Sequence, residues 1–181
     1  KTLTMADEGG FEELYRRYSV QIKALRPYVD VLLFETFFDT LNLKAALVAA
    51  KDQAPDVPVM VSVTLEKSGR LLSGQTLEAL VATVEPFSPL SIGLNCSFGA
   101  ADMLPHLATL SALTSCYVSV HPNAGLPNAL GEYDETPASM AAAMQPYFDK
   151  HLVNVVGGCC GTTPQHIALL AKMAQKTAPR V

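Results

Sequence analysis

The feature that most constrains the fold is a repeated pairing of a short apolar run with a helical pattern. Apolar runs at residues 29–34, 57–63, 90–95, 116–120 and 152–156 are each followed by a stretch with helical spacing of apolar residues. Strands that alternate with helices predict a parallel sheet covered by helices. The first run is almost wholly apolar, as expected of a strand buried on both faces.

The expected helices lie at residues 11–26, 41–53, 77–85, 102–113, 137–150 and 164–176, and the longer loops at 69–74 and 122–135. Asp39 or Thr40 can cap the second helix. Thr162 or Thr163 can cap the last helix, and Pro164 suits its first turn.

Residues with reactive or polar side chains fall where the predicted strands give way to loops. They are Glu35, Thr64, Asn95, Cys96, His121, Asn123, Cys159 and Cys160. In a (β/α)8 barrel these strand ends form one rim that carries the active site. A Rossmann-like sheet also binds ligands at its strand ends, but no G-x-G-x-x-G follows any of these runs.

The length sets the size of the predicted barrel. A complete barrel needs eight units and about 250 residues, whereas this chain has 181 residues and offers five units. We therefore expect residues 1–181 to form one domain, the C-terminal part of a (β/α)8 TIM barrel whose first three units are absent. The exposed sheet edges of such a piece would favour association.

Composition excludes several classes of protein. A net charge of -4 and a pI near 5.5 argue against nucleic-acid binding. The apolar runs are too short to span a membrane, and no signal-peptide pattern is present. Four cysteines are too few for a disulfide scaffold, so reduced thiols in a cytoplasmic protein fit better.

Two adjacent cysteines, Cys159 and Cys160, lie in the glycine-rich segment 156–164. Neighbouring residues of a strand point to opposite faces, so both thiols can share a target only where the backbone leaves strand geometry. Gly157, Gly158 and Gly161 allow this, because glycine tolerates positive φ. With Cys96, which ends another run, they predict a site for one zinc ion (Zn2+). Three cysteine ligands leave a fourth position open, where zinc can hold a substrate thiol as a thiolate able to attack an activated methyl group.

Other interpretations stay open for these segments. Cys116 fits a small apolar residue inside a strand, and Cys96 alone fits the core as well as a metal site. A disulfide between Cys159 and Cys160 would be strained. A glycine-rich loop before a helix can also bind phosphate, although that function gives the thiols no role.

Five further residues are candidates for substrate binding. Glu35 can bind an ammonium group or be a solvated carboxylate, and His121 can be a ligand, a proton carrier or a turn residue. Asn95 can orient Cys96, bind substrate or cap its own loop. Thr64 is more often a capping or packing residue than a ligand, and Asn123 is a turn former first.

Several motifs together resemble the homocysteine S-methyltransferase family, and within it the homocysteine-binding domains of cobalamin-dependent methionine synthases. They are Phe34-Glu35-Thr36, Ser73-Gly74-Gln75-Thr76, Gly93-Leu94-Asn95-Cys96, His121-Pro122-Asn123-Ala124-Gly125-Leu126-Pro127-Asn128, Gly131-Glu132-Tyr133 and Val156-Gly157-Gly158-Cys159-Cys160-Gly161-Thr162-Thr163-Pro164. The resemblance extends from about Phe11 to Lys176. The loop around His121 favours methionine synthase over relatives that use betaine or S-methylmethionine.

The resemblance implies a barrel with zinc bound by Cys96, Cys159 and Cys160 at its C-terminal rim, and Glu35 on the amino group of homocysteine. The implied reaction transfers a methyl group, originally from 5-methyltetrahydrofolate, from methylcobalamin to homocysteine and gives methionine. In the family, separate folate- and cobalamin-binding domains hold the donors, and nothing in this sequence predicts a site for them.

This sequence departs from the family in lacking the N-terminal strands, one of which carries an Asp-Gly motif that helps to hold homocysteine. We therefore expect this stretch alone to be inactive or very weakly active. The alternatives are a betaine- or S-methylmethionine-dependent methyltransferase, a non-catalytic barrel remnant and a phosphate-binding barrel.

Overall fold

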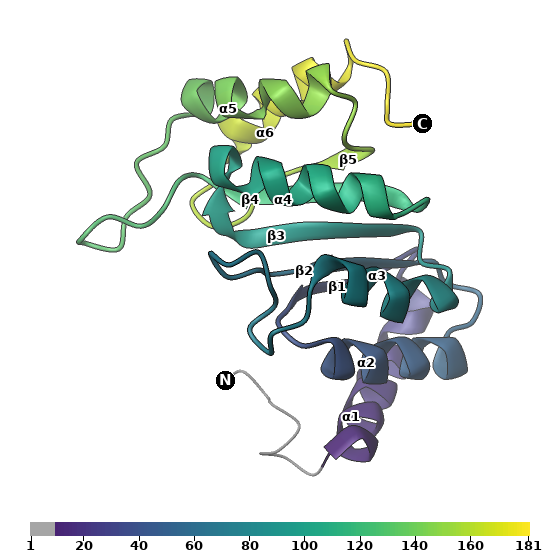
Figure 1. Cartoon of the computed structure of the whole chain (residues 1–181). Helices are drawn as coiled ribbons and strands as arrows, with labels where there is room; N and C mark the ends of the chain where they lie inside the picture. The colour runs from purple at the N-terminus through teal and green to yellow at the C-terminus, as the bar shows by residue number, and fades with distance from the viewer. Residues whose placement is uncertain (1–9) are drawn as a thin grey trace. The chain divides into compact units, whose positions relative to one another are not determined.

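The fold is seen in a computed structural model that describes residues 10–181 (Figure 1). Helices and strands alternate along it, and the short 3-10 turns η1 (Arg26–Tyr28) and η2 (Glu85–Phe87) follow the first and third helices. The helices are α1 (Gly10–Leu25), α2 (Thr40–Gln53), α3 (Leu77–Val84), α4 (Ala100–Leu113), α5 (Pro137–Asp149) and α6 (Pro164–Ala174). The strands are β1 (Leu32–Phe37), β2 (Val59–Val63), β3 (Ser91–Gly99), β4 (Tyr117–Asn123) and β5 (Val155–Val156).

The five strands follow one another in the sheet in their sequence order, β1-β2-β3-β4-β5. β1 pairs with β2, and β4 with β5, in parallel. Parallel strands that are neighbours in both sequence and space, with a helix in each connection, are the arrangement of a (β/α) barrel. The predicted fold class, an α/β fold consistent with a partial TIM barrel, is therefore confirmed.

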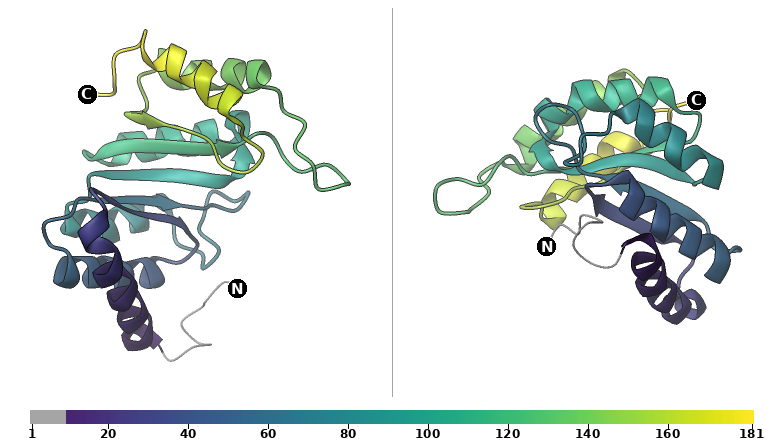
Figure 2. Two further views of the ribbon diagram at one scale, coloured as in Figure 1. Left: turned by 180° about the vertical axis from the view of Figure 1, so that it is seen from behind. Right: turned by 60° about the horizontal axis from the view of Figure 1, so that its bottom comes forward.

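The chain divides into two compact units, with the boundary between Ile92 and Gly93 inside β3. In the first unit α1 packs against α2, as both views in Figure 2 show. In the second unit α5 packs against α6. There the buried Tyr147 of α5 donates its hydroxyl hydrogen to the carbonyl oxygen of Ala100, at the start of α4.

The predicted helix caps are confirmed in both places. The Asp39 carboxylate accepts hydrogen bonds from the backbone N–H groups of Leu41 at 2.6 Å and Asn42 at 3.0 Å, so Asp39 caps α2. Thr163 is the N-cap residue of α6, and Pro164 is its first residue. These caps end the loops that follow β1 and β5.

Several predicted strand limits are wrong. β1 begins at Leu32 because residues 26–28 form a 3-10 turn, and it continues to Phe37 instead of ending at Phe34. A β-bulge between Phe34 and Phe37 interrupts the pairing with β2, so Glu35 and Thr36 lie inside the strand. β3 likewise extends past Cys96 to Gly99, and β5 is shorter than predicted.

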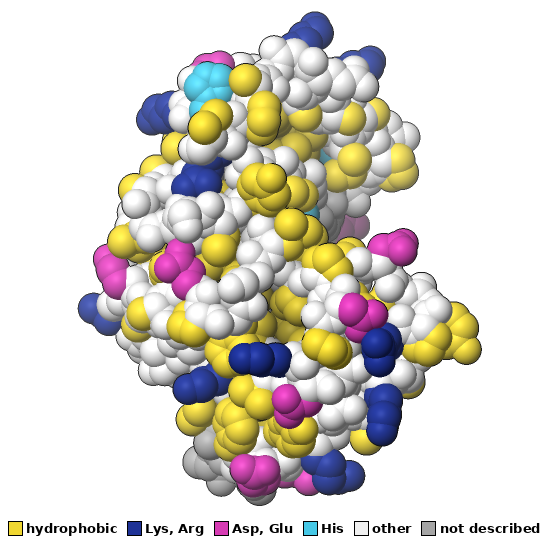
Figure 3. All heavy atoms as spheres, turned by 90° about the vertical axis from the view of Figure 1, so that its right-hand side faces the viewer, with side chains coloured by type: hydrophobic (Ala, Val, Ile, Leu, Met, Phe, Trp, Pro, Cys, Tyr) yellow, Lys and Arg dark blue, Asp and Glu magenta, His cyan; other side chains and the backbone are white. Residues whose placement is uncertain are grey.

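No helix among residues 10–181 is both long and apolar enough to cross a membrane. On the face drawn in Figure 3, basic and acidic side chains are interspersed instead of forming a single basic patch. That face therefore offers no concentrated positive surface of the kind that nucleic acids bind.

Candidate metal centre

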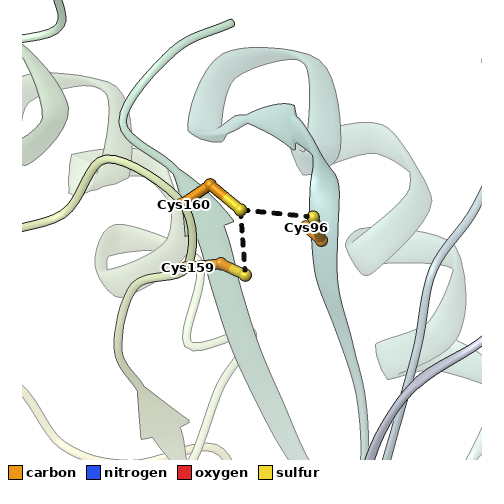
Figure 4. A group of neighbouring side chains, drawn as sticks. All are labelled: Cys96, Cys159 and Cys160. Carbon is orange, nitrogen blue, oxygen red and sulfur yellow. Dashed lines mark hydrogen bonds between the residues drawn. The ribbon is translucent and has the colours of Figure 1, made fainter. Parts of the chain in front are cut away.

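Three cysteine side chains converge within the second unit. Cys96 comes from β3, Cys159 and Cys160 come from the loop between β5 and α6, and their sulfurs point toward one another (Figure 4). The Sγ atom of Cys160 lies 3.8 Å from that of Cys96 and 3.9 Å from that of Cys159. All three sulfurs lie within 4.8 Å of one another.

Cys96 reaches this position because β3 leaves regular strand geometry. Cys96 and Ser97 both have a φ of 59°, in the left-handed region. A non-glycine residue in this conformation costs roughly 1–2 kcal/mol, and such strain persists only where the surroundings hold it. Asn95, directly before the pair, is only 1% exposed, so the strained segment starts from a buried anchor.

The glycines around the cysteine pair have different roles. Gly161 has a φ of +79°, which meets the expected need for left-handed backbone. The prediction of positive φ is wrong for Gly157 and Gly158, which are absent from the positive-φ residues among 10–181. A Cβ on Gly157 would lie 2.5 Å from Cδ2 of His121, so this position is glycine because the histidine ring approaches the backbone closely.

The end of β4 fixes the position of the cysteine pair through the backbone. Hydrogen bonds run from Gly157 N to Val120 O at 3.0 Å, Cys159 N to Pro122 O at 2.8 Å, Cys160 N to Asn123 Oδ1 at 3.1 Å, and Ala124 N to Cys160 O at 2.9 Å. Since the Asn123 side chain is only 4% exposed, its bond to Cys160 is protected from water. The pair is thus held independently of any ligand.

The same hydrogen bonds argue against the phosphate-binding alternative. Besides the three amides that donate to β4, Thr162 N donates to Cys159 O at 3.2 Å and Thr163 N to Nδ1 of His166 at 3.1 Å. A phosphate cradle needs backbone N–H groups that point at the ligand. Most of the backbone N–H groups in segment 157–163 already donate hydrogen bonds within the protein.

The sulfur separations fit a shared metal ion better than a disulfide. A disulfide brings two sulfurs to about 2.05 Å, far closer than any pair here. Two thiolates bound about 2.3 Å from one tetrahedral zinc ion lie about 3.8 Å apart. The two separations of 3.8 and 3.9 Å agree with that value, and an all-sulfur donor set suits zinc.

The charges of the three cysteines, when they are deprotonated, favour a cation at the cluster. Burial, followed by the charges of Cys96 and Cys160, raises the pKa of the Cys159 thiol to about 11. Three thiolates held this close repel one another, and a divalent cation reverses the balance by stabilising each of them. The cluster therefore suits a bound metal ion better than free thiolates.

The remaining predicted site residues fall in two groups. Asn95, His121 and Asn123 lie in the second unit, where Asn123 and His121 contact the backbone of the cysteine loop. Glu35 is exposed in the bulge of β1, and Thr64 is buried just after β2, both in the first unit. Their roles in substrate binding stay predictions.

Cys116 stands apart from the metal cluster. It is half-buried and precedes β4 instead of lying inside it, which corrects the predicted strand limit. Its backbone N–H donates to the Thr114 hydroxyl at 3.1 Å, and its carbonyl accepts from the Arg180 guanidinium at 2.9 Å. The backbone of Cys116 therefore helps to form the turn before β4.

The sequence predicts no role for two residues near the cysteine cluster. The neighbouring Cys160 thiol raises the pKa of the Tyr133 hydroxyl, and burial and the charges of the three cysteines act in the same direction. His166 accepts from Thr163 N through Nδ1, so its Nε2 carries the proton and donates to Glu135 O at 2.9 Å. The only sequence signal for His166 is its capping-box spacing from Thr163.

Comparison with known proteins shows the family to which this chain is related. The family described as homocysteine S-methyltransferase matches residues 2–174. Two solved structures of the homocysteine methyltransferase MmuM from Escherichia coli are each 26% identical to this chain. The apo form has a TM-score of 0.70, with 90% of this chain and 57% of that chain covered. The metallated form has a TM-score of 0.66, with 87% and 51% covered.

A Streptomyces coelicolor enolase, 9% identical with a TM-score of 0.53 over 95% of this chain and 47% of its own, shares the fold alone. The chain therefore spans about half the length of the solved structures it matches. The family match covers nearly all of residues 1–181, including the three converging cysteines. This chain belongs to the homocysteine S-methyltransferase family.

Proposed function

We propose that this chain supplies the zinc- and homocysteine-binding part of a methyltransferase that forms methionine. The observation that carries the proposal is the convergence of three cysteine sulfurs within 4.8 Å of one another. The match to the homocysteine S-methyltransferase family supports homocysteine as the methyl acceptor. The similar protein MmuM has a solved metallated form, which supports a metal in this kind of centre.

Each residue of the centre has a proposed task. Cys96, Cys159 and Cys160 would hold the zinc ion, which when bound supplies a Lewis acid that keeps the homocysteine sulfur deprotonated for methyl transfer. Asn123 fixes the peptide N–H of Cys160, and this bond limits the directions in which that thiol can point. We infer that these residues bind and orient the acceptor before the donor arrives.

The remaining substrate contacts follow from the resemblance. Glu35, exposed in the β1 bulge, would receive the ammonium group of homocysteine, because a carboxylate pairs well with a cation. Thr64, Asn95, His121 and Asn123 complete the proposed substrate-binding set. Each of them stands near the carboxyl end of a strand, where barrel enzymes place such residues.

The methyl donor is proposed to be methylcobalamin, held by a separate domain as in methionine synthases. The proline- and asparagine-rich loop after His121 supports this choice. Betaine or S-methylmethionine is the alternative donor. We also propose that the chain works in the cytoplasm as the C-terminal part of a complete barrel, and that it is inactive or nearly so by itself.

The first test is zinc per chain, measured by elemental analysis on protein purified without chelator. The parent and Cys116→Ser should carry about one zinc, because Cys116 lies outside the cluster. Cys159→Ser should carry little, because two thiolates bind zinc much more weakly than three. A folded, reduced parent without zinc, or a zinc content that Cys159→Ser leaves unchanged, would refute the proposed centre.

A further inference from the structure

The cysteine cluster offers a metal ion sulfur and no other kind of ligand atom. Among residues 10–181, no histidine or carboxylate joins the metal-binding group formed by Cys96, Cys159 and Cys160. His166, close to the same loop, accepts from Thr163 N at 3.1 Å through Nδ1 and donates to Glu135 O at 2.9 Å through Nε2. Both of its ring nitrogens are therefore engaged within the protein. The donor set is three thiols, which as thiolates are soft ligands.

The sulfur of Cys160 lies close to both of the others. Its Sγ atom is 3.8 Å from that of Cys96 and 3.9 Å from that of Cys159, so one ion can bind Cys160 together with either neighbour. Cys160 is also the exposed member of the group, whereas the other two cysteines are half-buried. An ion that arrives from solvent therefore meets Cys160 first and finds a second thiol on either side of it.

Each thiol is held by a different part of the backbone. Cys96 belongs to β3, whereas Cys159 N donates to Pro122 O at 2.8 Å and Cys160 N donates to Asn123 Oδ1 at 3.1 Å. None of these backbone contacts depends on the sulfur of a neighbouring cysteine. The loss of one thiol should therefore leave the other two in place.

Zinc and monovalent copper make different demands on such a cluster. Zinc takes four ligands, so three thiolates leave one position open for a substrate sulfur. Monovalent copper is a softer ion that thiolates select, and two or three thiolates complete its coordination. A copper ion bound by all three thiolates therefore leaves no position for a fourth sulfur.

We propose that the three-cysteine cluster is also a site for monovalent copper, which displaces zinc and leaves no position open for a substrate thiol. The inference rests on the proposed function only in taking zinc as the ion that is displaced. The exchange occurs at the same three thiolates: Zn2+ leaves, Cu+ enters, and no electron is transferred. Copper in this form is therefore an inhibitor of the centre.

The test adds monovalent copper anaerobically, from its complex with bathocuproine disulfonate, to four proteins incubated with zinc. They are the parent, Cys116→Ser, Cys159→Ser and the double variant that combines Cys159→Ser with Cys160→Ser. The absorbance of the chelator complex gives the copper bound per chain, and elemental analysis after desalting gives the zinc retained. X-ray absorption at the copper edge counts the sulfurs around copper before and after homocysteine is added. Circular dichroism checks that each variant is folded.

We expect the parent and Cys116→Ser to release their zinc and to bind about one copper ion through three sulfurs, with no fourth sulfur after homocysteine is added. Cys159→Ser should hold little zinc and still bind about one copper ion, through the sulfurs of Cys96 and Cys160. The double variant, with one thiol of the cluster left, should retain neither ion.

Three results would overturn this inference and leave the proposed function standing. They are a parent that keeps its zinc, a fourth sulfur on the copper ion, and a folded Cys159→Ser that binds copper no better than the double variant. A parent that never carries zinc but binds copper through three sulfurs would refute the proposed zinc centre and leave the copper site standing.

Discussion

The ends of β3 and β1 use the same backbone device for different purposes. In each strand a non-glycine residue adopts a left-handed conformation, Cys96 and Ser97 in β3 and Thr36 in β1. In β3 the turn follows the buried Asn95 and brings a thiol among two other sulfurs. In β1 it follows the exposed Glu35. Backbone strain of the same kind therefore does not reveal by itself what a strand end binds.

The ends of β3 and β1 differ in the groups that surround them. Cys96 faces two thiols whose backbone is already fixed by hydrogen bonds to β4. After the bulge of β1, the backbone is held by two hydrogen bonds of another kind. Thr64 N donates to Phe37 O at 3.0 Å, and the Ser73 hydroxyl donates to Phe38 O at 3.0 Å. A metal ion should therefore stabilise the β3 side of this comparison much more than the β1 side.

The largest expected effect is that of zinc removal. When free zinc exceeds its dissociation constant about a thousandfold, binding stabilises the folded state by about 4 kcal/mol. Chelation should therefore speed amide hydrogen exchange in segment 157–163 strongly and leave that of segment 35–38 almost unchanged. Mass-spectrometric hydrogen exchange measures both segments at once. Equal acceleration in the two segments would contradict this difference between the strand ends.

A smaller effect is expected at Glu35. Glu35→Gln keeps the size of the side chain but removes its charge, so homocysteine binding to the zinc-loaded chain should weaken about tenfold. Zinc content should stay at the parent level, because the three thiolates are untouched. Isothermal titration calorimetry measures the affinity for homocysteine. The control is Glu12→Gln, at an exposed residue of α1. Unchanged affinity would remove Glu35 from the proposed site.

The smallest effect concerns the strain itself. Replacing Ser97 by glycine relieves a left-handed φ but loosens the unfolded chain, so this change should raise the free energy of unfolding by about 0.5 kcal/mol. Ser115→Gly, at a residue without positive φ, should lower it by a similar amount. Urea denaturation measures the free energy of unfolding of both variants. A loss of stability in Ser97→Gly would show that its side chain contributes more than its backbone costs.

Much of this architecture could be predicted from the sequence. Apolar runs separated by helical patterns predict five parallel strands, and the carboxyl ends of such strands meet at one edge. That rule alone predicts that Cys96 lies near the Cys159–Cys160 pair, although more than sixty residues separate them. The caps Asp39 and Thr163 also follow from local chemistry.

Other features depend on contacts that no local pattern encodes. The limits of β1 are set by its pairing with β2, which continues beyond the bulge at Glu35 and Thr36. Tyr133 packs on Gly161 only because the chain turns at Asn128 and returns toward the cysteine loop. Periodicity describes a residue's neighbours along one element, so it could not predict either of these arrangements.

The hydrogen-bonded amides of segment 157–163 have a consequence for ligand discrimination. Metabolism supplies many phosphorylated compounds, and glycine-rich loops before helices are where proteins often capture them. Here most of those amides already donate hydrogen bonds within the protein. A phosphorylated metabolite therefore finds few free N–H donors in this segment and gains little from entering the centre.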